Sequence, residues 1–144
     1  MRKKSDAQIY LERAEMVDSI VANKLIEQQQ WRDIALGITA NMDGERVQSS
    51  GAKSKMADAL NKVIDMGAEI DRLIDRLVDT KREIVATIEQ LDSPYEYRLL
   101  HLRYIQYVDL VDIAERWGKD YTAITTAHGR ALAHVQEILD GRCE

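Results

Sequence analysis

The segment Leu110–Leu132 reads LVDIAERWGKDYTAITTAHGRAL, and its residue types at fixed spacing predict two helices joined by a tight turn. Helices that cross at roughly 90–120° need a small residue where their backbones meet, which Ala114 supplies. Gly118 stands at the turn, where a positive φ would cost a residue with a Cβ about 1–2 kcal/mol. Ile124 would hold the second helix against the first, and Asp109 could cap the first helix. The pattern is typical of a helix-turn-helix.

The composition predicts an all-α protein. The 144 residues include one proline and no phenylalanine, and helix-forming residues dominate, whereas alternating β-branched and aromatic runs are absent. The single cysteine, Cys143, cannot form an internal disulfide, which fits a reducing compartment. No apolar run approaches the ~20 residues of a membrane span. We therefore expect a cytoplasmic protein with no membrane contact.

The N-terminal part predicts a long antiparallel helical hairpin, a coiled coil over residues 1–92 with a loop at about 39–54. Apolar residues of the segment Ser5–Ile38 recur at helical spacing, and Gln28–Gln30 interrupt this stripe. We expect these glutamines to lie on the solvated surface. A second stripe repeats by steps of four and three, which is the heptad pattern of a coiled coil. Its members are Met56, Leu60, Val63, Gly67, Ile70, Ile74, Leu77, Lys81, Ile84, Ile88 and Leu91. The first helix is the simplest partner, and a second copy of the chain, giving a homodimer, is the alternative.

A second domain, residues 93–144, is predicted to begin at a capping box. Ser93 can accept a hydrogen bond as N-cap, Pro94 fits the first helical position, and Glu96 can reach back to the cap. The helix that starts here, at about Pro94 to Tyr107, makes a three-helix unit with the two helices of Leu110–Leu132, and this unit contains the helix-turn-helix.

The sequence contains no pattern typical of an enzyme. Phosphate-binding glycine loops, nucleophile elbows and paired metal-binding histidines are all missing. His101, His128 and His134 share no spacing that would bring them together on one metal. We therefore expect no catalytic residues, no metal and no cofactor.

The outward face of the second helix predicts contact with double-stranded DNA. Threonine can bond a base edge or contact a thymine methyl, and lysine and arginine neutralise phosphates. The residues expected at base edges are Tyr121, Thr122, Thr125, Thr126 and Arg130, and those expected on phosphates are Arg116 and Lys119. Residues 94–144 carry six Lys and Arg against eight Asp and Glu, a net charge of −2. Useful affinity would then require a dimer or an already bound partner.

Three segments of the C-terminal part resemble region four of bacterial sigma factors. They are LLHLRYI at Leu99–Ile105, DIAERWG at Asp112–Gly118 and HGRAL at His128–Leu132. The whole chain is similar to the ArpU/RinA-type phage-encoded regulators of late transcription, and Val47–Ser50 also looks like the corresponding segment of that group. The resemblance implies a sequence-specific regulator that activates late packaging and lysis genes with host RNA polymerase. Thr125 stands where region four usually carries arginine.

Two other functions remain open from the sequence. A coiled coil with a helix-turn-helix is also found in small terminase-like oligomers that package phage DNA. Alternatively, the acidic heptad helix could bind a protein, with no DNA binding at all.

Overall fold

The computed structural model describes the backbone of residues 3–44 and 50–142, and the side chains of these residues except 38–44, 50 and 52. Every regular element in this described part is helical, which confirms the all-α prediction. In order, the elements are α1 (Asp6–Gly44), α2 (Ser50–Ile88), α3 (Pro94–Leu100), the π-helix η1 (His101–Ile105), α4 (Leu110–Trp117) and α5 (Tyr121–Arg142).

The chain forms two compact units. One consists of residues 18–76, and the other combines residues 1–17 with residues 77–144. The second unit includes the first turns of α1 and the last turns of α2 because these turns share a buried cluster with α5. The division into domains at residues 92 and 93 stays a prediction.

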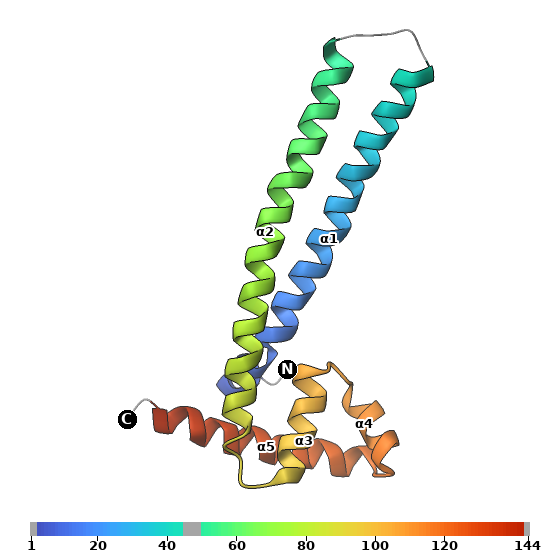
Figure 1. Cartoon of the computed structure of the whole chain (residues 1–144). Helices are drawn as coiled ribbons and strands as arrows, with labels where there is room; N and C mark the ends of the chain where they lie inside the picture. The colour runs from blue at the N-terminus through green and yellow to red at the C-terminus, as the bar shows by residue number, and fades with distance from the viewer. Residues whose placement is uncertain (1–2, 45–49, 143–144) are drawn as a thin grey trace. The chain divides into compact units, whose positions relative to one another are not determined.

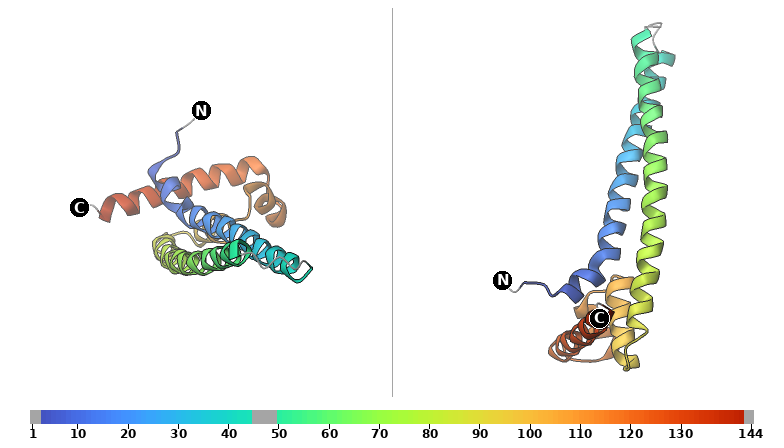
Figure 2. Two further views of the ribbon diagram at one scale, coloured as in Figure 1. Left: turned by 90° about the horizontal axis from the view of Figure 1, so that it is seen from above. Right: turned by 90° about the vertical axis from the view of Figure 1, so that its left-hand side faces the viewer.

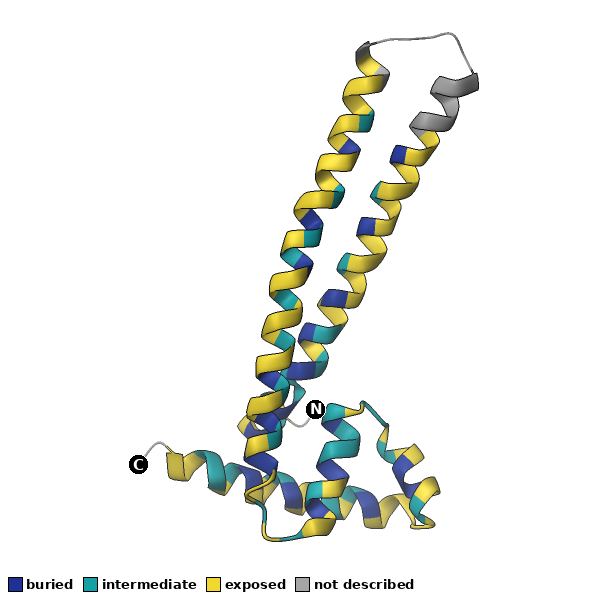
Figure 3. Ribbon diagram, in the orientation of Figure 1, coloured by how far each residue is buried: buried dark blue, intermediate teal, exposed yellow. Residues whose placement is uncertain are grey.

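In the unit of residues 18–76, α1 and α2 lie side by side and run in opposite directions (Figures 1 and 2). Their buried positions face each other and their outer faces are exposed (Figure 3). The buried residues include Val21 and Ala35 on α1 and Ala59, Met66 and Ile70 on α2.

Between Ala59 and Ile74, the buried seam on α2 is displaced by one residue from alternate positions of the predicted stripe. Ala59 and Met66 are buried, whereas Leu60, one residue further along, is 45% exposed and Ile74 is 40% exposed. The stripe therefore repeats by three and then four residues from Val63, and not by four and then three. Both neighbours are apolar at these positions, so the alternation alone could not distinguish them.

Gln28 is buried in the seam of residues 18–76, which corrects its expected place on the surface. Its side-chain amide donates a hydrogen bond of 3.0 Å to the backbone oxygen of Val63. A Cβ at Gly67 would lie 3.4 Å from the Gln28 amide nitrogen, so the missing side chain leaves room for this contact. Because a buried amide needs a partner, the pair favours one register of α1 against α2.

The predicted loop at 39–54 is wrong in its extent, because α1 continues to Gly44 and α2 begins at Ser50. The turn-forming residues of this stretch cost a helix about 1 kcal/mol or less each. Once a helix is nucleated, each further residue adds a backbone hydrogen bond, which can offset that cost. Residues 45–49, which include most of the resembling segment Val47–Ser50, lie outside the described part.

Two clusters form the core of the unit that contains α3, η1, α4 and α5. The larger one joins α1, α2, α3, η1 and α5 through Ala7, Leu11, Ala14, Ile84, Ile88, Leu100, Tyr104, Ala131 and Val135. The smaller one joins α3, α4 and α5 through Leu99, Ile113, Ala114 and Ile124. Ala114 and Ile124 thus meet in one cluster, which fixes α4 against α5.

A buried polar group ties three helices of this unit together. The Thr87 hydroxyl on α2 donates to the backbone oxygen of Glu83 at 3.0 Å and lies 2.8 Å from the Tyr10 hydroxyl on α1. The Arg142 guanidinium on α5 donates to the hydroxyl oxygen of Thr87 at 2.9 Å. Thr87 is fully buried, and its loss would remove the shortest hydrogen bonds that the Tyr10 hydroxyl and the Arg142 guanidinium make.

We predict that Thr87→Val lowers the free energy of unfolding by about 0.5–1.5 kcal/mol, the net contribution of a hydrogen bond. Urea denaturation followed by circular dichroism measures the change. Thr80→Val is the matched control, because Thr80 is also buried on α2 but makes no side-chain hydrogen bond to a described residue. Equal effects of the two substitutions would contradict the role of Thr87.

Candidate nucleic-acid interface

The turn between α4 and α5 is closed by two backbone hydrogen bonds. The N–H of Lys119 donates to the oxygen of Ala114 at 2.9 Å, and the N–H of Gly118 donates to that of Glu115 at 3.3 Å. Gly118 has a φ of 62°, the left-handed conformation that ends helices in this way. Asp109 precedes α4 but makes no side-chain capping bond, so its predicted capping role is wrong.

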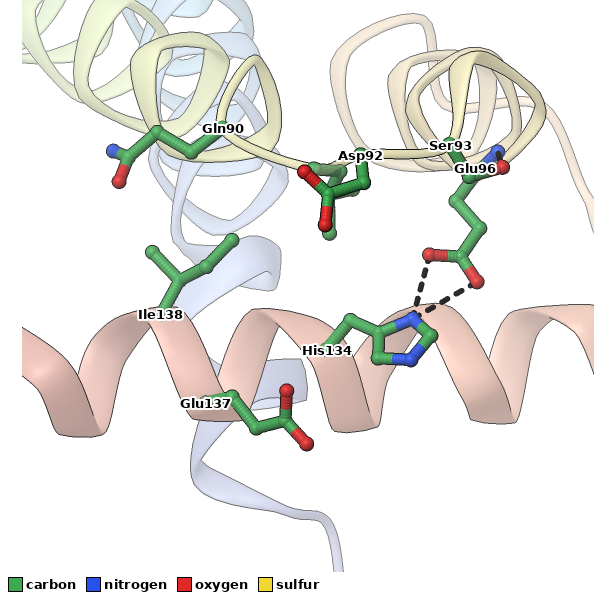
Figure 4. A pocket seen from close by; sticks show the side chains of 8 residues that line it. Gln90, Asp92, Ser93, Glu96, His134, Glu137 and Ile138 are labelled. Carbon is green, nitrogen blue, oxygen red and sulfur yellow. Dashed lines mark hydrogen bonds and ion pairs between the residues drawn. The ribbon is translucent and has the colours of Figure 1, made fainter.

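One of the two hydrogen bonds of the predicted capping box forms at the start of α3. Ser93 accepts a hydrogen bond of 3.2 Å from the N–H of Glu96, and Pro94 is the first helical residue. The Glu96 carboxylate does not reach back to the cap, and instead accepts a bond of 2.7 Å from Nδ1 of His134 (Figure 4). This hydrogen bond raises the pKa of His134 above its usual value. The contact fixes α5 to the start of α3.

The helix from Pro94 ends earlier than Tyr107 because its last turn is a π-helix. The N–H of Gln106 donates to the oxygen of His101, five residues back, at 3.1 Å. Tyr107 then has a φ of 61°, which is uncommon for a residue with a Cβ. The Lys81 ammonium lies 5.1 Å from the centre of its ring.

The N-terminal half of α5 presents most of the predicted base-contacting residues to solvent. Ile124 on the opposite face is fully buried. Tyr121, Thr122, Thr126 and Arg130 are exposed, and Thr125 is half-buried. These five side chains lie on one helix, within three turns.

The threonine hydroxyls on this surface are already engaged. Thr125 donates to the backbone oxygen of Thr122 at 2.9 Å, and Thr126 donates to the same oxygen at 2.8 Å. Such back-bonding satisfies a threonine in mid-helix. Each hydroxyl hydrogen is used, so each oxygen is left as an acceptor. At Thr125 and Thr126, this surface can therefore accept a hydrogen bond from a ligand more readily than it can donate one.

His128 adds no positive charge to α5 at neutral pH. Burial lowers the pKa of its imidazole, with the nearby Arg103 acting in the same direction. Its Nε2 lies 2.7 Å from the hydroxyl of Tyr104, a buried phenol whose pKa is raised by desolvation. This hydrogen bond anchors α5 to η1.

The predicted phosphate contacts, Arg116 and Lys119, are both exposed at the end of α4 and in the turn. Arg116 also lines a pocket of about 410 Å³, which sequence reasoning missed. Its walls are Tyr97, Arg98, His101, Leu102, Gln106, Arg116 and Trp117. Arg98 and Arg116 are eighteen residues apart on different helices, so no spacing in the sequence indicates that they meet.

A second pocket, of about 280 Å³, has the opposite charge. It lies between α5 and the segment that leads into α3, and Asp92, Glu96 and Glu137 line it beside His134 (Figure 4). Carboxylates repel phosphates, so this side of α5 is unsuited to nucleic acid. Among the described residues, no group of three or more His, Cys, Asp or Glu is placed to hold a metal ion.

We predict that Gly118→Ala lowers the free energy of unfolding by about 1–2 kcal/mol, because alanine must take the left-handed conformation at this turn. Gly129→Ala, on the exposed face of α5 with nothing within 4 Å of a new Cβ, should instead raise it by about 0.5–1 kcal/mol. Thermal and urea unfolding of the two variants provide the test. Stabilisation by both substitutions would contradict the strained turn.

No described helix combines the length and the apolar character needed to cross a bilayer. Comparison with known proteins finds no family model, no curated protein and no solved structure that matches this chain.

Proposed function

We propose that this protein is a sequence-specific DNA-binding regulator of transcription. The single observation that carries the proposal is the exposed polar surface of α5, which directly follows the turn at Gly118 and lies opposite the buried Ile124. In the proposed arrangement, an antiparallel hairpin precedes a three-helix unit of α3 with η1, α4 and α5. Helices α4 and α5 would form the helix-turn-helix, with α5 in the major groove.

The resemblance to sigma-factor region four and to the ArpU/RinA-type regulators supports this proposal of a DNA-binding regulator. It adds the expectation of a phage-derived activator of late genes that works with host RNA polymerase. Tyr121, Thr122, Thr125, Thr126 and Arg130 would contact base edges. Arg116 and Lys119 would contact phosphates.

The back-bonded threonines narrow the bases that this surface would select. Because Thr125 and Thr126 donate to the oxygen of Thr122, each is left to accept a hydrogen bond through its oxygen. Adenine N6 and cytosine N4 are the donors in the major groove, and a thymine methyl can contact the threonine methyl. Each of these threonines is therefore expected to face adenine, cytosine or thymine, and guanine, which has only acceptors in the major groove, is disfavoured there.

We predict that Lys119→Ala weakens binding to all duplexes by a similar factor and lowers the slope of log K against log salt by about 0.9. Thr126→Val, which keeps the shape but loses the hydroxyl, should remove about 1–3 kcal/mol of discrimination at one base pair. Fluorescence anisotropy with duplexes selected from a random pool measures both effects.

Lys62→Ala is the control for charge, since Lys62 is exposed on α2 in the other unit. It should leave DNA affinity unchanged. The proposal fails if the protein binds no duplex at 50 mM salt, or if Lys119→Ala and Lys62→Ala behave alike.

A second copy of the chain is the proposed partner of the outer face of α2. Leu60, Ile64 and Ile74 are 45%, 69% and 40% exposed, and they lie beside the buried seam at the same heptad spacing. Isolated surface leucines are ordinary, but a repeated apolar stripe is typical of a further helix–helix contact. A dimer would also join two weakly charged DNA-binding surfaces, which raises their combined affinity.

We predict that the protein is a dimer in solution and that Ile64→Glu converts it to a monomer, because a charge would be buried at the contact. Lys62→Glu is the control, because Lys62 is exposed on a different side of α2 from Ile64, and it should leave the dimer intact. Light scattering with size-exclusion chromatography measures the mass. A monomeric parent protein would exclude this contact, and a ring of many copies would favour the DNA-packaging alternative.

A further inference from the structure

The pocket between α3, η1 and α4 has the chemistry of an anion site with aromatic walls. Arg98 and Arg116 are exposed and belong to its lining, and neither guanidinium forms an ion pair with a described residue. None of the lining residues is acidic. The two cations therefore face solvent across the pocket without neutralisation from its walls.

Aromatic rings define the rest of this pocket. The Arg98 guanidinium lies over the Trp117 ring, 5.3 Å from its centre, and the Tyr95 ring packs on the same indole with the ring centres 5.2 Å apart. Tyr97 and His101 are a further pair of rings, with their centres 5.7 Å apart. Leu102 adds an apolar surface. The volume of about 410 Å³ exceeds that of a bare phosphate and falls within the range of small-ligand sites.

The π-helical turn of η1 orients one donor in the pocket. In a π-helix, residues five apart lie on the same face, and here Gln106 follows His101 by five positions. The Gln106 side-chain nitrogen donates to Nδ1 of His101 at 2.9 Å. The neutral imidazole then carries its proton on Nε2, which makes that atom a hydrogen-bond donor. An α-helical turn would place Gln106 on another face and lose this constraint.

We propose that this pocket binds a single nucleotide. Arg98 and Arg116 hold the phosphate, and the aromatic wall of Tyr97 and Trp117 contacts the base. Guanidinium groups suit phosphate oxygens, and bases stack on aromatic side chains regardless of sequence. The nucleotide is either a free mononucleotide or one unit of a single strand, because a base paired in a duplex cannot enter a pocket. The site shares Arg116 with the proposed duplex surface, but none of its lining residues belongs to α5.

The test uses the indole of Trp117 as reporter in the full chain with Trp31→Phe, which leaves one tryptophan. We expect deoxyadenosine 5′-monophosphate and a short single-stranded oligonucleotide to change its fluorescence with saturation and to compete with each other. Deoxyadenosine, which lacks the phosphate, should bind at least tenfold more weakly. An oligonucleotide that binds tenfold more tightly than the mononucleotide identifies a single strand as the occupant, and equal affinities identify the free nucleotide.

Arg98→Gln and Arg116→Gln should each weaken mononucleotide binding at least tenfold, with helicity unchanged by circular dichroism. Arg130→Gln, on the α5 surface, should leave mononucleotide binding unchanged and should weaken binding to duplex DNA. The proposal is overturned if 10 mM mononucleotide gives no saturable change, or if Arg98→Gln and Arg116→Gln bind like the parent. A protein that binds duplex DNA but no mononucleotide would overturn this inference alone. A protein that binds the mononucleotide but no duplex would overturn only the proposed function.

Discussion

The burial of Ile124 against Ala114 is the contact on which the C-terminal surfaces depend. Both side chains belong to the cluster with Leu99 and Ile113, which joins α3, α4 and α5. That packing decides which face of α5 is buried, and therefore which residues it exposes. It also brings the end of α4 to the side of α3, where Arg116 and Arg98 line one pocket. Both proposed ligand surfaces follow from one small apolar cluster.

Buried polar contacts add specificity to cores that are otherwise simple. The Gln28 side chain donates a hydrogen bond to the backbone of Val63 in one unit, and the Thr87 hydroxyl is hydrogen-bonded to Tyr10 and Arg142 in the other. Apolar stripes with a heptad repeat can pair in several registers with similar burial, whereas an unsatisfied amide or hydroxyl is costly. Each polar contact therefore penalises the alternatives more than it stabilises the native packing. The hydrogen bond between His128 and Tyr104 is a further polar contact of this kind, and it involves α5.

The helices and the turn were predictable because their signals are local. Gly118 takes a positive φ, and Ser93 and Pro94 start α3, since backbone sterics and capping depend only on near neighbours. The extent of the loop at 39–54 was not predictable in this way, because weak helix formers there compete with helix propagation. The choice between Ala59 and Leu60 was also open, since both are apolar. It was settled by the position of α1.

The sequence by itself determined that the protein is all-α, where its turn at Gly118 lies and which polar residues α5 carries. Composition and short spacings contain that information because helix propensity and turn sterics act within a few residues. Only the tertiary structure decided that Glu96 bonds His134 and that Arg98 and Arg116 line one pocket. These outcomes depend on how helices pack and on which rotamers that packing leaves, and residues eighteen or more apart carry no spacing rule for it.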